Sequence, residues 1–495
     1  MTSQTLREAR KYEETYEKRI SREERPGFHY SPRVGWLNDP NGFSYYQGKY
    51  HLFHQYHPYD PYWGPMHWGH AVSEDLLHWE YLPAVLAPDQ TYDRDGCFSG
   101  SAVMLPDGRQ LLMYTGVQRV PQGDGEPVDK QTQCLAVGNG LDYEKYEHNP
   151  VLDKKDIPED CSEADFRDPK MWRNEDGTYS CAIANRAADG SGQILLYTSP
   201  TGFDWKFKSV LKANHNRFGV MWECPDLFKL DGKDVILCSP MDMLPEGFEY
   251  DNGNGTLCLI GEFDEETGTF QDEANQAVDY GIDFYAPQTM KTPDGRTVMI
   301  AWMQNWDTSR LHPKETRWFG QMTLPRELSL KNGRLIQKPV RELEALRSNK
   351  AEYKDVVFEG TITLEGVAGR RIDMEIEITP GDEQDIYRKF AVYFAQDNGI
   401  YTSVSFRPHE SVLKVDRKFS GSRRAALHNR RSQVRSENGE LKLRLILDRF
   451  SAELFINDGE QTVTTTIYTD QAADGISFFA DGSVKMNVVK YDLIG

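Results

Sequence analysis

The sequence predicts an all-β protein in which a five-bladed β-propeller is followed by a C-terminal β-sandwich, with a short N-terminal helix. Between about residues 26 and 340, short aromatic-rich runs with alternating polarity are separated by Asp-Gly, Gln-Gly and Pro turns, which is typical of hairpins. Five polar motifs recur in this region at intervals of 55 to 69 residues, with about four strands to each interval. Such repetition is typical of propeller blades. Beyond residue 351 strict alternation returns, as expected of two packed sheets.

The 495 residues suit two domains, and the spacing of the motifs divides them further. We expect a helical extension over residues 1–26, the propeller over 27–340, a linker helix over 341–350 and the sandwich over 351–495. The charged segment Met1–Arg25 reads as a solvent-facing helix. In the linker, Leu343 and Leu346 lie on one side of the expected helix. The basic stretch 414–435 could bind phosphate, but a solvated loop or strand edge is the better prediction.

Composition excludes several classes of partner. The net charge is −20 with 27% charged residues, so nucleic acid and anionic lipid, which need clustered Lys and Arg, are not expected as partners. No run of about 18 apolar residues occurs, and a membrane span is not expected either. The seven cysteines include no Cys-x-x-Cys pair, which argues against a zinc knuckle and a disulfide scaffold. With no secretion signal at the charged N-terminus, we expect a cytoplasmic protein.

Each of the five repeats opens with a short polar motif at the start of its first strand. Because the first strand of each propeller blade lines the central channel, we expect these motifs to converge on one axial pocket. The openings are Asn38-Asp39-Pro40, Phe98-Ser99-Gly100, Arg167-Asp168-Pro169, Glu223-Cys224-Pro225-Asp226 and Tyr285-Ala286-Pro287-Gln288.

Three of these motifs contain an acid that could carry chemistry. Asp39 is held between Asn38 and Pro40, and Asp168 follows Arg167, whose charge should keep it ionised. Glu223 lies among apolar neighbours and is expected to hold a proton. Each acid alone could be an ordinary turn or surface residue, but all three are predicted at the same place in repeats one, three and four. A proton donor paired with a carboxylate nucleophile is what glycoside cleavage requires.

The evenly spaced His51, His54 and His57 invite a metal-site interpretation. Successive strand residues point to opposite faces, so this spacing does not put three imidazoles on one face. We therefore predict no metal and no cofactor.

These motifs resemble those of glycoside hydrolase family 32, the β-fructofuranosidases, over nearly the whole chain. The matching strings are Trp36–Gly42, Phe98–Ser101, Phe166–Pro169, Trp222–Asp226 and Asp283–Gln288, with Asp448–Gly459 in the second domain. The resemblance implies a propeller followed by a sandwich, and a small sugar as substrate.

The resemblance also implies roles for individual residues. Asp39 would be the nucleophile, Glu223 the general acid and base, and Asp168 the stabiliser of the transition state. Arg167 would bind the sugar and tune the carboxylates, and Cys224 would tune Glu223 by packing. The other expected fructose-pocket residues are Trp36, Asn38, Gln55, Trp63, Phe98, Ser99 and Trp302, with Trp306 and Trp318 as alternatives to Trp302.

The resulting prediction is a retaining β-fructofuranosidase acting on sucrose, sucrose 6-phosphate or short fructooligosaccharides. An exo-inulinase or levanase that prefers longer fructans, a non-catalytic fructoside-binding protein, and fructosyl transfer to a sugar stay open as alternatives. Arg310, Lys314 and Arg317 could recognise a phosphate, although a solvated charged loop is the preferred interpretation. A homodimer formed through the sandwich is a further expectation.

Overall fold

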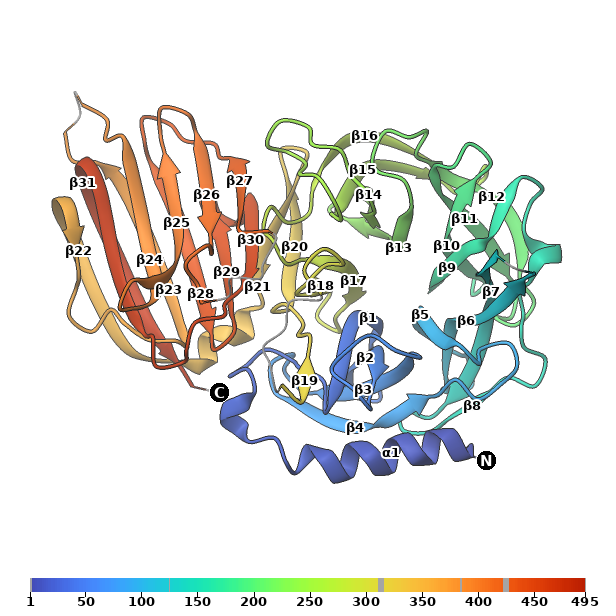
Figure 1. Cartoon of the computed structure of the whole chain (residues 1–495). Coiled ribbons are helices and arrows are strands. Elements are labelled where there is room, and N and C mark those ends of the chain that lie inside the picture. Colours follow the sequence, from blue (N-terminus) through green and yellow to red (C-terminus); the bar gives the residue numbers. More distant parts are fainter. Residues whose placement is uncertain (1, 124, 310–315, 383–384, 422–426, 495) are drawn as a thin grey trace.

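A computed structural model describes residues 2–123, 125–309, 316–382, 385–421 and 427–494. It consists of a ring of sheets beside a second all-β domain, and one long helix lies along the ring (Figure 1). The helix α1 (Gln4–Glu17) begins at Ser3, whose hydroxyl accepts a hydrogen bond from the Leu6 amide.

Helix α1 is less exposed than its charge suggests. Its Leu6, Ala9 and Glu13 side chains are buried. The Ala84 amide donates to Glu13 Oε1 at 3.0 Å, and Arg10 Nε donates to the Ala84 carbonyl at 2.8 Å. The prediction of a solvent-facing helix is therefore wrong for one face. The side chains of that face hydrogen-bond to backbone groups of the outermost strand of the first blade, which would otherwise be an open sheet edge.

The propeller has five antiparallel sheets arranged around a common centre, with β1, β5, β9, β13 and β17 innermost (Figure 1). Neighbouring strands are joined by the predicted turns, such as Gln47-Gly48, where both residues have positive φ. The first two blades are β1 (Gly35–Tyr46), β2 (Lys49–His57), β3 (His67–Ser73), β4 (Trp79–Leu86), and β5 (Gly96–Met104), β6 (Gln110–Gln122), β7 (Gly125–Gly138), β8 (Tyr143–Lys145). The third and fourth are β9 (Cys161–Arg173), β10 (Tyr179–Ala187), β11 (Gly192–Ser199), β12 (Lys206–Ala213), and β13 (Trp222–Leu230), β14 (Lys233–Pro240), β15 (Leu257–Asp264), β16 (Thr269–Ala277).

The fifth blade closes the ring. It contains β17 (Tyr285–Lys291), β18 (Thr297–Trp302), β20 (Arg326–Lys331) and β21 (Arg334–Pro339). Between β18 and β20 the chain leaves this blade, and β19 (Trp318–Phe319) pairs in parallel with β1 of the first blade. This pairing ties the end of the propeller to its beginning.

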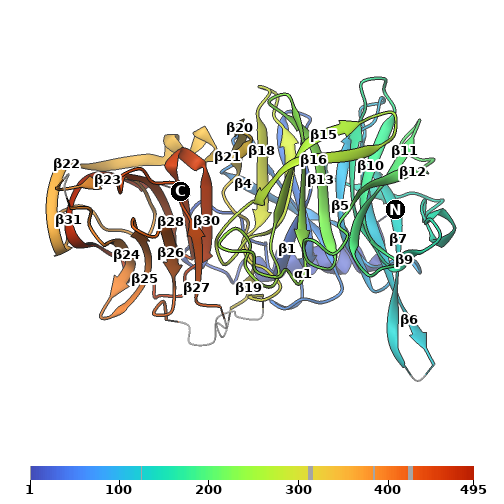
Figure 2. The ribbon, with the colours of Figure 1, turned by 90° about the horizontal axis from the view of Figure 1, so that it is seen from above.

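The second domain is a β-sandwich whose layers are connected by one long strand, β31 (Gly475–Leu493) (Figure 2). The first part of β31 pairs with β24 and the second part with β23, while β22 runs along the whole of it. Along strands such as 372–380 and 441–448, buried apolar residues alternate with more exposed ones, as predicted. The buried residues face the core of the domain. The strands are β22 (Arg347–Ile362), β23 (Ile372–Pro380), β24 (Lys389–Asp397), β25 (Ile400–Arg407), β26 (Val412–Asp416), β27 (Asn429–Gln433), β28 (Leu441–Asp448), β29 (Ser451–Ile456) and β30 (Gln461–Thr466).

The connection between the domains is short. The predicted linker helix is a 3₁₀ helix over Arg341–Leu346, followed directly by β22; Leu343 and Leu346 are buried as expected. The basic stretch forms a strand edge as predicted, because β27 is the outermost strand of its sheet, but two of its arginines are not solvated. Although residues 422–426 lie outside the described part, Arg417 and Arg430 are buried and bind propeller acids rather than solvent.

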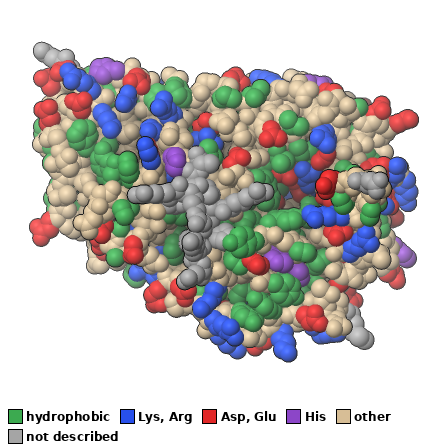
Figure 3. Space-filling view, viewed as in Figure 1, with side chains coloured by type: hydrophobic (Ala, Val, Ile, Leu, Met, Phe, Trp, Pro, Cys, Tyr) green, Lys and Arg blue, Asp and Glu red, His purple; other side chains and the backbone are tan. Residues whose placement is uncertain are grey.

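Positive and negative side chains are mixed over the face of the molecule in Figure 3, and the coloured atoms there form no continuous basic surface. Among the described residues, no helix has the length and apolar character needed to cross a bilayer. All seven cysteines are free.

Candidate active site

A β-bulge in the innermost strand of every blade positions the five polar motifs. The regular pairing is interrupted between Leu37 and Pro40 in β1, and one residue is inserted between Phe98 and Gly100 in β5. The corresponding interruptions in β9, β13 and β17 span Arg167–Lys170, Glu223–Asp226 and Tyr285–Gln288. Bulges bend a strand and redirect its side chains. Proline, which lacks an amide donor, is tolerated at such a position.

The register corrects one prediction. The three acids lie at the bulge of their strands, but not at the same position. Glu223 is the last paired residue before the bulge, equivalent to Arg167 and Tyr285. Asp168 is the first residue within its bulge, and Asp39 is the second within its own. The three acids therefore leave their strands at different positions relative to the bulge.

The first group of contacts surrounds Glu223. Arg167 Nε donates to Glu223 Oε1 at 3.0 Å, and Arg167 Nη2 lies 3.0 Å from the same oxygen. Tyr285 Oη donates to Glu223 Oε2 at 2.8 Å, and Trp306 Nε1 is 3.3 Å from the same oxygen. Three consecutive blades thus contribute equivalent residues to one hydrogen-bonded row. The sequence analysis gives Tyr285 no role, although Tyr285 opens the fifth motif, and it names Trp306 only as an alternative to Trp302.

The second group surrounds the two aspartates. Ser99 Oγ donates to Asp39 Oδ2 at 2.6 Å, and the Cys224 amide donates to Asp168 Oδ2 at 3.0 Å. The Cys224 Sγ lies 3.7 Å from Asp39 Oδ2 and 3.6 Å from Asp168 Oδ2. Asp39 Oδ1 accepts no hydrogen bond from the described residues. One oxygen of Asp39 is held in place and the other is unengaged.

Asp168 and Cys224 both have left-handed backbone conformations, with φ of 61° and 49°. Such conformations are uncommon for residues other than glycine and asparagine, and they are retained where the surroundings fix them. Here they turn the Cys224 amide toward the Asp168 carboxylate. The bulge therefore supplies a backbone donor as well as side chains.

The charges are distributed differently from the prediction. Burial, which outweighs the nearby Arg167 charge, raises the pKa of Asp168 to about 7. Burial likewise raises the pKa of Asp39 to about 6, with Glu223 adding to the increase and the Ser99 hydrogen bond opposing it. Arg167 lowers the pKa of Asp168 as expected, but burial has the larger effect, so the pKa of Asp168 lies above its ordinary value. The Arg167 guanidinium lies against Glu223 and is 4.0 Å from Asp168.

Arg167 is held on its other side by groups that the sequence did not single out. Its Nη1 donates to Asp165 Oδ1 at 2.9 Å and lies 3.4 Å from Gln131 Oε1. Thr115 Oγ1 accepts the Asp168 amide hydrogen bond at 3.1 Å. Gln131 and Thr115 come from the second and third strands of blade two, outside the motifs, so only the fold reveals them.

The predicted aromatic walls fall into an exposed and a buried set. Trp63 is 39% exposed, and its ring centroid lies 6.1 Å from that of the half-buried Phe98. Trp302 is completely buried and packs against Trp306 at 5.0 Å. Trp306 is half-buried and reaches Glu223, so it is better placed than Trp302 to touch a bound sugar.

The remaining predicted pocket residues support the inner strands. Trp36 Nε1 donates to Asn38 Oδ1 at 2.8 Å, and Gln55 Nε2 donates to the Cys97 carbonyl at 3.0 Å. All three of Trp36, Asn38 and Gln55 are almost fully buried. Of the phosphate candidates, Arg310 and Lys314 lie outside the described residues, and Arg317 donates to the Arg19 carbonyl.

The three regularly spaced histidines have separate partners. His51 Nδ1 lies 3.0 Å from His70, His54 Nε2 lies 2.9 Å from the Tyr30 hydroxyl, and His57 Nδ1 lies 3.3 Å from the Pro65 carbonyl. Among the described residues, no group of three His, Cys, Asp or Glu side chains is arranged to hold a metal ion.

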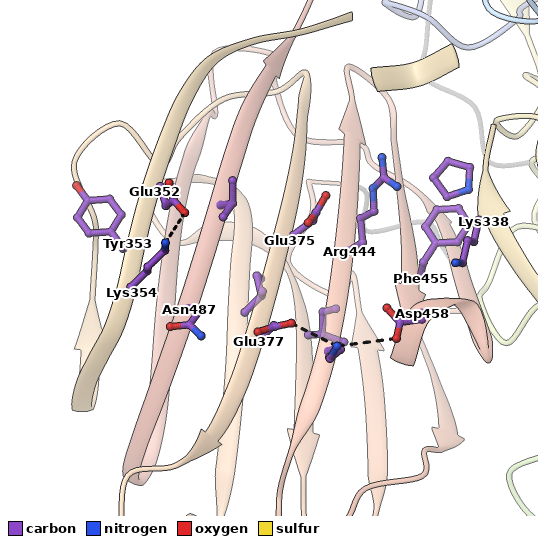
Figure 4. A pocket seen from close by; sticks show the side chains of 15 residues that line it. Lys338, Glu352, Tyr353, Lys354, Glu375, Glu377, Arg444, Phe455, Asp458 and Asn487 are labelled. Carbon is purple, nitrogen blue, oxygen red and sulfur yellow. Dashed lines mark ion pairs between the residues drawn. The ribbon is translucent and has the colours of Figure 1, made fainter. Parts of the chain in front are cut away.

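A cavity of about 430 Å³ lies apart from this site, on the sandwich (Figure 4). Its charged side chains neutralise one another: Lys354 is 3.3 Å from Glu352, and Lys442 is 3.4 Å from Glu377. None of the three acids lines it.

The central arrangement combines a carboxyl group held by an arginine and a tyrosine with a second carboxyl group that has one unengaged oxygen. Such a pair can donate a proton to a leaving group and attack the carbon from which it departs. The third carboxyl group, Asp168, can in its ionised form stabilise a neighbouring positive charge.

Two family models together match nearly the whole chain. The model for the N-terminal domain of glycosyl hydrolases family 32 matches residues 29–339, and that for the C-terminal domain matches residues 342–493. A raffinose invertase of Escherichia coli is 36% identical over 461 residues, covering 92% of both chains. A sucrose-6-phosphate hydrolase of Bacillus subtilis is 35% identical over 472 residues, covering 94% of this chain and 93% of the relative.

The solved structures include a mutant of the Bombyx mori GH32 β-fructofuranosidase BmSUC1 in complex with sucrose. It superposes with a TM-score of 0.84 at 36% identity, over 100% of this chain and 99% of that chain.

Proposed function

This chain belongs to glycosyl hydrolase family 32, and we propose that it is a retaining β-fructofuranosidase with Asp39 as nucleophile and Glu223 as general acid and base. Membership makes it a glycoside hydrolase. Its substrates carry a terminal, non-reducing β-D-fructofuranoside: sucrose, sucrose 6-phosphate or short fructooligosaccharides. The observation that carries the proposal is the convergence of Asp39, Asp168 and Glu223, from three separate blades, within one network of contacts.

The first step breaks the glycosidic bond. Protonated Glu223 gives its proton to the glycosidic oxygen, and an Asp39 oxygen attacks the anomeric carbon of fructose. The alcohol, glucose in the case of sucrose, leaves with that proton, and a fructosyl ester of Asp39 remains. Asp168 stabilises the positive charge that develops on the sugar ring.

The second step releases fructose. Ionised Glu223 takes a proton from a water molecule, whose oxygen attacks the anomeric carbon and regenerates the Asp39 carboxylate. Two displacements on the same carbon give retention of configuration. Arg167 and Tyr285 contact the two oxygens of Glu223 and hold the carboxyl group in position for this step.

A direct experiment is incubation with sucrose and detection of free glucose. Asp39→Ala should abolish release, while Glu223→Ala should affect sucrose far more than a nitrophenyl β-D-fructofuranoside, whose leaving group needs no proton. In methanol, retention predicts methyl β-D-fructofuranoside as the trapped product. Failure of the intact protein to release glucose, or equal loss on both substrates in Glu223→Ala, would contradict the proposal.

The substrate range is tested by measuring kcat/KM side by side for sucrose, sucrose 6-phosphate, a short fructooligosaccharide and inulin. A preference for inulin would identify a fructan exohydrolase instead. The cytoplasmic location and the homodimer stay predictions, tested by cell fractionation and by light scattering of the purified protein.

A further inference from the structure

The side chains that hold Glu223 Oε2 both come from the fifth blade. The segment before Tyr285 is hydrogen-bonded to the sandwich, and the turn that carries Trp306 is hydrogen-bonded to that segment. Tyr285 begins β17, and Trp306 follows β18. Their two hydrogen bonds to Oε2 are 2.8 and 3.3 Å long. The position of this carboxyl group therefore depends on what fixes residues 280–285 and 303–309.

Residues 280–283 run beside β30 of the sandwich. Tyr280 N donates to the Thr462 carbonyl at 2.8 Å, and Ile282 N donates to the Thr464 carbonyl at 2.9 Å. Gly281 lies between them, where a Cβ atom would be only 2.1 Å from the Thr464 carbonyl oxygen. The two backbones approach so closely that only glycine fits, and backbone hydrogen bonds join the segment to the second domain.

A buried ion pair fixes the end of this segment. Asp283 Oδ2 accepts hydrogen bonds from Arg417 Nη1 at 2.6 Å, from Thr466 N at 2.7 Å and from Thr466 Oγ1 at 2.9 Å. Asp283 and Arg417 are almost completely buried, 0% and 1% exposed. Charge-assisted bonds in a dry interior are strong and directional. Asp283 is two residues before Tyr285, so the ion pair sets where β17 begins.

The same segment holds the Trp306 turn. Asn305 Nδ2 donates to the Ile282 carbonyl at 2.8 Å. The Asn305 Oδ1 accepts from the amides of Asp307 at 2.8 Å and Thr308 at 3.1 Å. The Asn305 hydrogen bonds therefore connect the turn that carries Trp306 to the segment that ends at Asp283.

We propose that Arg417 of the sandwich is a positioning residue for Glu223. By fixing Asp283, it holds Tyr285 and Trp306 against the carboxyl group that donates the proton. The inference rests on the proposed role of Glu223, and it gives the second domain a part in the reaction although Arg417 itself touches no substrate.

The test compares two substrates in one variant. Replacing both members of the ion pair, Arg417→Met with Asp283→Asn, avoids leaving a buried charge unpaired. We expect kcat/KM to fall at least 10-fold on sucrose, mainly in kcat, and by less than 3-fold on a nitrophenyl β-D-fructofuranoside. Displacement of the proton donor lowers kcat/KM mainly for the substrate whose leaving group needs protonation.

A matched control separates positioning from general damage to the sandwich. Arg370 is also buried in this domain, but its bonds go to sandwich groups such as Thr469 Oγ1 at 2.9 Å and the Asp470 carbonyl at 2.8 Å. Arg370→Met should lower the melting temperature while the ratio of the two kcat/KM values stays unchanged.

Equal losses on both substrates in the double variant, or a selective loss in Arg370→Met, would overturn the inference. If the double variant does not fold, Thr466→Val removes one of the hydrogen bonds to Asp283 and should lower kcat/KM on sucrose selectively, by about 3-fold. An unchanged ratio of the two kcat/KM values in this variant would also overturn the inference.

Glu223→Ala is assayed in parallel. If that variant does not distinguish the two substrates, the assignment of Glu223 fails instead.

Discussion

Asp39 lies at the centre of the contacts and is 8% exposed, so its carboxylate is poorly solvated. Poor solvation favours the protonated form, which is why burial raises its pKa to about 6. A weakly solvated carboxylate with one unengaged oxygen is a better nucleophile than one surrounded by water. The same property opposes folding, because the ionised group is less stable in the protein than in the unfolded chain.

Asp39→Asn should therefore abolish turnover and stabilise the fold. The folded pKa is raised, so the wild-type group destabilises the protein as pH increases above 3.8, and this effect is complete above about 6. At pH 7 the variant should gain up to about 3 kcal/mol of unfolding free energy. Urea unfolding at pH 7 and pH 4 checks the sign: the gain should be present at pH 7 and absent at pH 4.

The activity should depend on pH for the same reason. The nucleophile must be ionised, so kcat/KM should fall as pH decreases through about 6. The fall should persist with a nitrophenyl β-D-fructofuranoside, which still needs the nucleophile but not the proton donor. A kcat/KM that stays constant between pH 5 and pH 7 on both substrates would contradict this assignment.

At the scale of the element, the inner-strand bulge is the unit that makes the site. The sequence reveals the motifs, because Pro and polar residues at the start of a strand are conspicuous. It does not reveal the pairing, which places Glu223 level with Arg167 and Tyr285 and shifts Asp39 and Asp168 from that level. Register is decided by hydrogen bonds to the neighbouring strand.

Helix α1 is a second element whose contacts the local sequence does not reveal. Its charged sequence indicates an exposed helix, yet Glu13 is buried against the Ala84 amide, and burial raises the pKa of Glu13 to about 7. The helix protects the edge of blade one by satisfying backbone groups, which requires a polar residue at a buried position.

Two variants of Glu13 should behave differently. Glu13→Gln keeps an acceptor for the Ala84 amide and removes the buried charge, so stability at pH 8 should be equal to or greater than that of the wild type. Glu13→Ala leaves the amide unpaired and should lose about 1–3 kcal/mol. Thermal unfolding at pH 8 separates them. Equal destabilisation by both substitutions would show that the helix is held by other contacts.

At the scale of the whole molecule, the two domains are joined by buried ion pairs. His29 at the start of the propeller lies 2.8 Å from Asp448 and 2.8 Å from Glu453 of the sandwich. Arg326 of the fifth blade also contacts Glu453. Burial lowers the pKa of His29, but its bonds to the two carboxylates outweigh this effect and raise the pKa to about 9. The interface therefore contains a cationic histidine.

This cation predicts a loss of stability in alkaline solution. The folded pKa lies above the ordinary value of 6.5, so the stabilisation is fully present below pH 6.5 and is lost as pH increases through about 9. The change should reach about 3 kcal/mol. Urea unfolding of the wild type and of His29→Gln across pH 6.5–9.5 measures it; the wild-type curve should fall and the variant curve should not. Parallel curves would contradict the assignment.

The sequence by itself determined the class of fold, the order of the domains and the three acids of the candidate site. Alternation, turn residues and repeated motifs are local signals, and they stand in the chain before it folds. The tertiary structure decided which residues surround the acids: Tyr285, Trp306, Gln131 and Thr115 come into contact only when the blades close into a ring. It also decided that Arg417 lies buried against Asp283, 134 residues away in the chain, rather than in solvent. Burial and pairing are properties of neighbours distant in sequence, and for that reason they could not be read from local pattern.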